Sequence, residues 1–295
     1  MVDLVAELKE TADAVEKQLD ELLAVPGGRE ARVFEAMRYA MFAGGKRVRP
    51  FLAVASADLF GVHREQSIRV AAAIEMVHTY SLVHDDLPCM DDDDLRRGKP
   101  SAHIEFDEAT ALLAGDGLLT NAFEVLADEK TSHYAGIRSE LVSSLARAAG
   151  SHGMVGGQMI DLLSEHEDLD VGEIARLQQL KTGALIAFAC ESGAILGKAD
   201  QDERHALHAY AYDLGLTFQT TDDLLDAEGS PEQIGKAVGK DEGRGKATVV
   251  SLLGIEAARQ QAQRLADQAV THLAHFGPRA DLLRELTSFV INRRI

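Results

Sequence analysis

The sequence contains no tryptophan and only six prolines, and aromatic residues make up just 5% of its 295 positions. All-β proteins are enriched in aromatic and β-branched residues, so this composition disfavours a sheet fold and favours helices. Hydrophobic residues nevertheless account for 46% of the chain, which is enough to build a large core. We therefore expect an all-α protein.

Cysteine and long apolar runs are also scarce. Cys89 and Cys190 are the only cysteines, too few for a disulfide framework or a four-ligand zinc site, and they indicate a reducing compartment. The first residues, MVDLVAELKETADAV, are amphipathic and acidic, unlike a secretory signal. No stretch approaches the ~20 consecutive apolar residues of a membrane span. These features predict a soluble cytoplasmic protein.

Basic residues are outnumbered, with 30 Lys and Arg against 48 Asp and Glu and a formal net charge of -18. A surface this acidic does not follow a nucleic-acid backbone, so no nucleic-acid partner is expected. A polyanionic ligand would need local pockets of basic side chains.

Apolar residues recur at three- and four-residue spacings over most of the chain, which predicts helices. No alternating strand pattern, internal repeat or linker is present, so we expect a single domain over residues 1–295. The predicted helices span residues 3–24, 29–43, 50–60, 66–87, 107–128, 132–149, 152–164, 171–196, 203–227, 248–275 and 280–294.

The densest cluster of charge is SLVHDDLPCMDDDDLRRGKP at residues 81–100, where six aspartates precede two arginines and a lysine. The run begins at the C-terminal end of an apolar helix, where carboxylates are unfavourable unless cations accompany them. Pro88 breaks the helix, so Asp85 and Asp91 can share a ligand only through an unwound turn. The run predicts a magnesium-diphosphate site, and a solvated charged loop is the alternative.

A second acidic set lies near the end of the predicted helix at 203–227. Asp222 and Asp226 are four residues apart on one helical face, with Gln219 a turn below Asp222. Two copies of an arrangement that is electrostatically costly without cations favour metal binding over a solvated surface.

Basic residues gather in three places that could bind an anion. Gly44 and Gly45 precede three bases and could form an anion clasp, or simply a helix C-cap followed by solvent-facing bases. Lys181 and Thr182 begin an apolar stretch, where a lysine either snorkels or pairs with an anion. Residues 235–247 form a glycine-rich basic loop that could act as a lid.

Several motifs together resemble the trans-prenyl diphosphate synthases, in the order found in that family: GGKRVRP at 44–50, HDDLPCMDDDDLRRGKP at 84–100, GGQMIDL at 156–162, KTG at 181–183, FQTTDDLLD at 218–226 and GK followed by GKAT at 235–248. The resemblance covers most of the chain. It implies an isoprenoid synthase fold, mostly antiparallel helices around a large central cavity, usually in a homodimer. Leu-Pro-Cys-Met between the first acids is similar to bacterial farnesyl synthases and some geranylgeranyl synthases.

The resemblance also implies residue roles, in a site holding three Mg2+ ions. Magnesium would be bound by Asp85 and Asp91 with support from Asp86, and by Asp222 and Asp226. The allylic diphosphate would contact Arg96, Lys181, Lys236 and Lys246, and isopentenyl diphosphate would contact Lys46, Arg49, His78 and Arg97. Thr182 and Gln219 would lie beside the ionising carbon, while Gln158 and Asp161 would have supporting positions.

The implied activity is head-to-tail condensation of isopentenyl diphosphate with an allylic diphosphate. Tyr80 and Ser81 lie one turn before Asp85, and an aromatic residue there is typical of farnesyl synthases, in which it limits chain length; a core tyrosine is the alternative. Other readings are a geranylgeranyl synthase, a class I terpene cyclase, a His-Asp metal hydrolase and a non-catalytic synthase subunit. The repeated DDLLD motif and the missing tryptophan disfavour a cyclase.

Overall fold

Helices form nearly all the regular structure of the computed structural model, which describes residues 3–164, 169–228 and 248–292. The prediction of an all-α fold is confirmed. By their internal contacts the residues divide into two units, Asp3–Val142 and Ser143–Ile295, with the division inside α7 (Ala135–Ala149).

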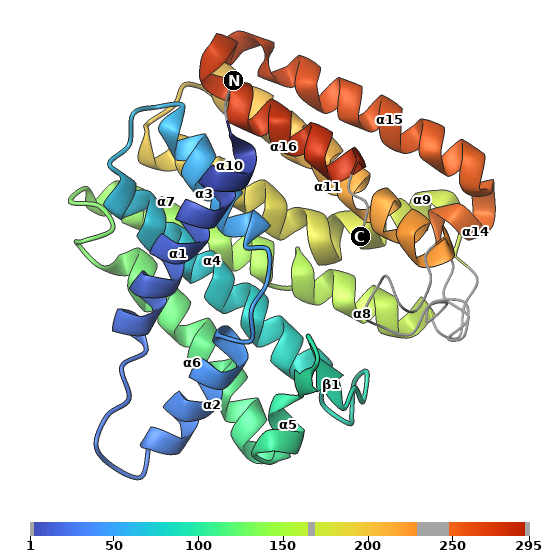
Figure 1. The fold of residues 1–295 in the computed structure, drawn as a ribbon. Helices are drawn as coiled ribbons and strands as arrows, with labels where there is room; N and C mark the ends of the chain where they lie inside the picture. The colour runs from blue at the N-terminus through green and yellow to red at the C-terminus, as the bar shows by residue number, and fades with distance from the viewer. Residues whose placement is uncertain (1–2, 165–168, 229–247, 293–295) are drawn as a thin grey trace. The chain divides into compact units, whose positions relative to one another are not determined.

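The first unit is built around α4 (Arg64–Asp85), which packs against its other long helices (Figure 1). Every residue from Ser67 to Val77 is buried, as the apolar sequence of this helix predicts. The surrounding helices are α1 (Leu4–Leu22), α2 (Ala31–Met41), α3 (Val48–Asp58), α5 (Ala102–Glu105) and α6 (Glu108–Ala127).

A short hairpin follows α4, although the sequence pattern predicts no strand. Strands β1 (Leu95–Arg96) and β2 (Lys99–Pro100) pair antiparallel, with Arg96 opposite Lys99. The connecting residues Arg97 and Gly98 both have positive φ, 54° and 77°, as in the type I′ turns that suit two-residue hairpins. Strands of two residues are too short to show alternation, so only the Arg-Gly turn could have indicated them.

The second unit is organised around α11 (Gln201–Glu228), which packs against α15 (Ile255–His272), α10 (Ala184–Leu196) and α16 (Asp281–Asn292). Figure 1 shows α15 and α16 running alongside each other. The remaining elements are α8 (Met154–Ser164), α9 (Val171–Gln178), the π-helical turn η1 (Gln179–Gly183), α14 (Val249–Leu253) and the 3-10 segment η2 (Leu273–Ala280).

Two predicted helices are interrupted. The helix predicted at 171–196 widens into the π-helical turn η1, which contains Lys181 and Thr182. The helix predicted at 248–275 breaks at Gly254, whose φ of 81° ends α14. No helix within the described ranges is long and apolar enough to cross a membrane.

Candidate active site

The first acidic set lies where α4 ends. Asp85 is the last helical residue and Asp86 is the C-cap. The chain then turns back, because the amide of Asp91 donates to the carbonyl of Asp85 at 2.8 Å and the amide of Asp92 donates to the carbonyl of Leu87 at 3.2 Å. Asp91 thereby returns to the end of the helix through the unwound turn that its spacing predicts.

Asp86 and Arg96 join the hairpin to the end of α4. Asp86 is only 2% exposed, and its two carboxylate oxygens accept hydrogen bonds from Arg96 Nε at 3.0 and 3.2 Å. Burial acts to lower the pKa of Arg96, but the hydrogen bonds and charge of Asp86 outweigh it and raise the pKa. Asp86 therefore holds Arg96 in place, while Asp85 and Asp91 are partly exposed. Magnesium binding by Asp85 and Asp91 with support from Asp86 stays a prediction.

His78 is partly buried on α4, and it forms a basic group with Arg49 and Arg97, whose charges act on it. Burial lowers the pKa of His78 well below its usual 6.5, and the nearby charges of Arg49 and Arg97 lower it further. The guanidinium of Arg97 also lies against Gly45, where a Cβ would collide with it. The structure thus brings together Arg49, His78 and Arg97, three of the four residues predicted to bind isopentenyl diphosphate.

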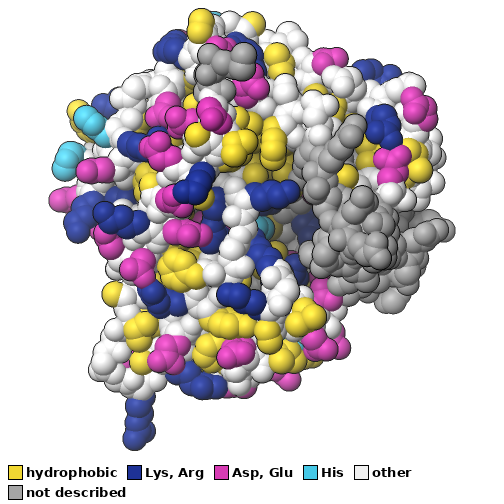
Figure 2. All heavy atoms as spheres, in the orientation of Figure 1, with side chains coloured by type: hydrophobic (Ala, Val, Ile, Leu, Met, Phe, Trp, Pro, Cys, Tyr) yellow, Lys and Arg dark blue, Asp and Glu magenta, His cyan; other side chains and the backbone are white. Residues whose placement is uncertain are grey.

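The fourth predicted residue, Lys46, is exposed in the loop that leads into α3. The first turn of α3 contains Arg49 and no acidic residue. A helix N-terminus carries partial positive charge, so bases here are costly by themselves but suit a bound anion. Figure 2 shows Lys and Arg side chains beside Asp and Glu on one face, so the net negative charge leaves room for local basic groups.

Tyr80 is buried, with 7% of its surface exposed, and its ring packs edge-on against His84 at 5.6 Å between centroids. A His84 ring nitrogen lies 3.0 Å from the carbonyl oxygen of Leu112 on α6. Burial, and then the charge of Asp85, raise the pKa of Tyr80. Its neighbour Ser81 donates a hydrogen bond to the carbonyl of His78 at 2.8 Å. Tyr80 is therefore a bulky, fixed group in the last turns of α4.

In the second unit, the three aspartates near the end of α11 have different environments. Asp223 is 8% exposed and accepts hydrogen bonds from Gln178 Nε2 at 3.2 Å and from the amide of Val249 at 3.4 Å. It therefore joins α11 to α9 and α14. Asp222 and Asp226 are partly exposed. Only these two were predicted as metal ligands.

The π-helical turn η1 presents Lys181 beside α8. Lys181 Nζ donates to Asp161 Oδ2 at 2.7 Å, and Asp161 is 7% exposed. Gly157 of α8 lies against the backbone of Lys181, where a Cβ would collide with the backbone nitrogen. This contact gives Asp161 a definite partner, which the sequence alone did not supply. Thr182 and Gln219 are each partly exposed, in η1 and α11.

Two predicted ligands, Lys236 and Lys246, lie outside the described residues, as does the rest of the loop at 235–247. Within the described ranges, no three acidic, histidine or cysteine side chains form a ready-made metal cluster. Magnesium typically binds one or two carboxylates, several waters and substrate phosphates. The paired placement of Asp85 and Asp91 fits such a partly assembled site.

The helical architecture and the similarity to solved synthases place the chain among enzymes of the isoprenoid synthase fold, with acidic sets near the ends of two helices and an ion pair between Lys181 and Asp161. The polyprenyl synthetase family model matches residues 30–275. The chain belongs to this family, and the prediction of a prenyltransferase is confirmed.

Relatives of known identity match along almost the whole chain. Farnesyl diphosphate synthase of Haemophilus influenzae is 43% identical over 98% of both chains. Geranylgeranyl diphosphate synthase of Cyanophora paradoxa is 39% identical over 99% of this chain and 97% of its own. The crystal structure of an FPP/GFPP synthase from Zymomonas mobilis superposes with a TM-score of 0.90 at 49% identity, covering 98% of both chains.

Proposed function

We propose that this protein condenses isopentenyl diphosphate with dimethylallyl and then geranyl diphosphate, and releases farnesyl diphosphate. The observation that carries the proposal lies in the first unit. An acidic pair, Asp85 and Asp91, lies at the end of the same helix on which the charges of Arg49 and Arg97 act on His78. One group suits a diphosphate bound through metal and the other suits a diphosphate bound directly.

We assign three magnesium ions to the carboxylates of Asp85, Asp91, Asp222 and Asp226. We assign the binding of the allylic diphosphate to Arg96 and Lys181. Magnesium supplies positive charge to the departing diphosphate. The buried partners of Arg96 and Lys181 keep these cations in place before substrate binds, which supports their use as fixed electrostatic groups. We assign Lys236 and Lys246 to the same diphosphate on the resemblance of their motif alone.

Isopentenyl diphosphate would be bound by Arg49, His78, Arg97 and Lys46, because guanidinium groups match the geometry of phosphate oxygens. Thr182 and Gln219 would turn oxygen dipoles toward the allylic carbon as it becomes positive. An apolar cavity would keep water away from the cation until the double bond of isopentenyl diphosphate attacks. The released diphosphate would then accept the proton, so no side chain is assigned as base.

The test is incubation of the purified protein with magnesium, isopentenyl diphosphate and each allylic diphosphate in turn, with products identified by mass. We expect chain elongation that ends at farnesyl diphosphate. No elongation with any starter would contradict the proposal and point to a non-catalytic subunit. Release of a hydrocarbon from farnesyl diphosphate would instead indicate a cyclase.

A geranylgeranyl product is the second candidate, because the chain is 39% identical to the geranylgeranyl diphosphate synthase of Cyanophora paradoxa. Tyr80 favours the shorter product, since its buried ring is bulky and lies one turn before the metal-binding end of α4. We predict that Tyr80→Ala lengthens the product, as shown by chromatography with isopentenyl diphosphate in excess. Tyr134→Ala, at a tyrosine that is 62% exposed and lies outside α4, is the matched control, and an unchanged product from Tyr80→Ala would exclude Tyr80 as the chain-length floor.

We also propose a homodimer in the cytoplasm. The family resemblance and exposed apolar side chains on α6 support self-association. The cytoplasmic location rests on the cysteines, because the exposed Cys89 and the buried Cys190 both have free thiols.

A further inference from the structure

Arg47 stands between the two predicted phosphate ligands Lys46 and Arg49, yet its environment is the opposite of theirs. Its side chain has no exposed surface, whereas Lys46 is exposed. Its φ of 47° places it in the left-handed region, which is unfavourable for a residue with a Cβ. Such a conformation persists only where surrounding contacts fix it.

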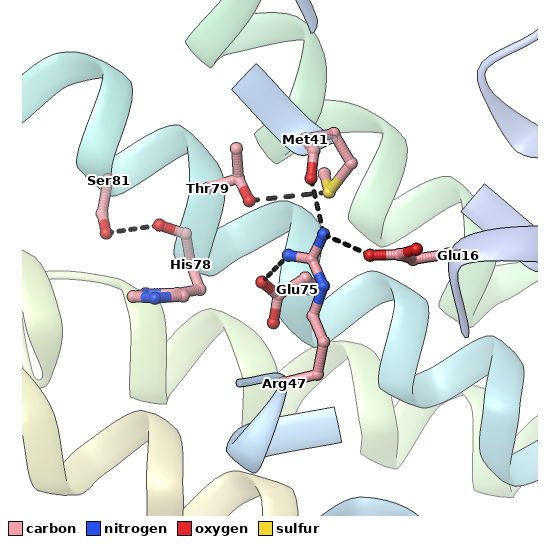
Figure 3. A network of polar contacts seen from close by, with 7 residues as sticks. All are labelled: Glu16, Met41, Arg47, Glu75, His78, Thr79 and Ser81. Atoms are coloured by element: carbon pink, nitrogen blue, oxygen red, sulfur yellow. Dashed lines mark hydrogen bonds and ion pairs between the residues drawn. The ribbon is translucent and has the colours of Figure 1, made fainter. Parts of the chain in front are cut away.

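Those contacts come from three other helices, as Figure 3 shows. The Arg47 guanidinium forms an ion pair with Glu75 of α4, which is itself 2% exposed. Arg47 Nη2 donates hydrogen bonds to Glu16 Oε1 of α1 at 3.2 Å and to the carbonyl oxygen of Met41 in α2 at 2.6 Å. Because Arg47 is also the N-cap of α3, it ties α1, α2 and α4 to the start of that helix.

This network joins α4 near His78 to both ends of the loop before α3. Glu75 lies one turn before His78 on α4, and Thr79 Oγ1 on the same turn donates to Met41 Sδ at 3.5 Å. Met41 and Arg47 are the two ends of the loop that contains Gly45 and Lys46. The loop is therefore fastened at both ends to the turn of α4 that carries His78.

Electrostatics argues against Arg47 as another phosphate ligand. Partial desolvation lowers the pKa of Arg97 most, and the charge of Glu75 raises it while the charges of Arg47 and Arg96 lower it, so Glu75 offsets crowding among the guanidinium groups. If Arg47 turned toward a diphosphate, Glu75 would remain buried with its charge unpaired, which is strongly unfavourable. Arg47 is held where it is by the cost of leaving Glu75.

We propose that Arg47 is a positioning residue whose buried ion pair with Glu75 sets the placement of Lys46 and Arg49 and hence the affinity for isopentenyl diphosphate. The inference rests on the proposed binding of that substrate by Lys46, Arg49, His78 and Arg97. Arg47 itself contacts no substrate.

The test measures steady-state kinetics of Arg47→Lys and Glu75→Gln, varying isopentenyl and geranyl diphosphate separately. Lysine cannot reproduce the forked contacts to Glu75, Glu16 and Met41. We expect KM for isopentenyl diphosphate to rise on the order of tenfold, because loss of a charge-assisted hydrogen bond misplaces the loop. KM for geranyl diphosphate should stay as in the unaltered protein.

Arg69→Lys is the matched control, since Arg69 of α4 is a buried arginine like Arg47. It forms an ion pair with Asp128 at 3.0 Å and donates to Thr131 Oγ1 at 3.0 Å, away from the basic group around His78. Arg69→Lys should lower the melting temperature without changing either KM. A KM change equal to that of Arg47→Lys would mean that the effect reports general destabilisation and would overturn the inference.

Two further variants cover the case in which Arg47→Lys does not fold. Glu16→Gln removes charge from a carboxylate that is 42% exposed and should raise KM for isopentenyl diphosphate slightly but selectively. The double variant Arg47→Met/Glu75→Leu replaces the ion pair by apolar groups and should recover stability while KM stays high. A normal KM in the double variant would show that the directed contacts are not needed.

The two possible failures are distinguishable in the same assay. If the unaltered protein elongates no allylic diphosphate, the proposed function fails. If it elongates normally but Arg47→Lys and Glu75→Gln leave KM for isopentenyl diphosphate unchanged, only the positioning role of Arg47 fails.

Discussion

At the scale of single residues, each aspartate-rich motif contains acids with different tasks. Asp86 and Asp223 are buried and bonded to groups of the protein, whereas their neighbours Asp85 and Asp222 are partly exposed. Each aspartate-rich motif thus contains a buried carboxylate that holds other protein groups in place and a partly exposed carboxylate that is a proposed metal ligand. The division follows burial, because a buried carboxylate is stable only when its oxygens accept hydrogen bonds.

Separate substitutions of the adjacent Asp222 and Asp223 in the second motif test this difference between structural and metal-binding carboxylates. Asp223→Asn removes the carboxylate charge of the residue that accepts hydrogen bonds from Gln178 Nε2 and the amide of Val249. The substitution should lower the free energy of unfolding by about 1–3 kcal/mol. Asp222→Asn should raise the magnesium concentration needed for half-maximal rate, because Asp222 is a proposed metal ligand. Denaturant unfolding and magnesium titration of activity measure the two effects, and equal behaviour of the variants would contradict the assignment.

His78 should make stability depend on pH. Its pKa in the folded protein lies well below 6.5, because burial and then the charges of Arg49 and Arg97 disfavour the imidazolium. The stability that neutral His78 contributes to folding is fully present above pH 6.5. It falls as the pH drops toward the folded-state pKa of His78, because the unfolded chain there binds a proton that the folded chain does not.

His78→Gln should reduce this loss by up to about 1.4 kcal/mol per pH unit below pH 6.5. Urea unfolding at pH 7, 6 and 5 measures the effect, and the exposed His63→Gln is the matched control for removal of an imidazole. An unchanged slope in His78→Gln would show that the histidine is protonated normally in the folded protein.

Elements were predictable where the periodicity was long, as in α4 and α11, and unpredictable where packing decides the backbone. The π-helical turn η1 lies between α8 and α11, with Gly157 against Lys181 and Gly215 against Gly183. Nothing local to KTG encodes this widening. The role of Arg47 was equally hidden, since Glu75 is 28 residues away. A lone glutamate in an apolar helix is nevertheless a signal that a buried partner exists.

Close packing of α8 against η1 gives a prediction for the element. The methyl group of Gly157→Ala would push η1 away and move Lys181 from its position beside Asp161. A shift of about 1 Å in a catalytic site can cost on the order of 100-fold in rate, so we expect a large fall in kcat. Gly136→Ala in α7, with open space around the added Cβ, is the control. Full activity of Gly157→Ala would show that η1 tolerates displacement.

For the whole molecule, the family model covers residues 30–275 and thus parts of both units into which the contacts divide the described chain. The single domain over residues 1–295 stays a prediction. The aspartate motifs are distributed over both units, at the end of α4 in one and near the end of α11 in the other. Sequence order could identify these motifs, whereas the partner of each charged group required the packed structure.

The predicted homodimer gives the last test. Leu112 and Leu113 on α6 are 47% and 57% exposed, and Ile104 on the adjacent α5 is 52% exposed. Burying such side chains between two copies is favourable by roughly 25 cal/mol per Å2 of apolar surface. Light scattering should give twice the chain mass of 31.9 kDa, and Leu113→Glu should shift the protein toward monomer. Val5→Glu, at a 67% exposed position on α1, should leave the dimer intact. A dimer unaffected by Leu113→Glu would place the interface elsewhere.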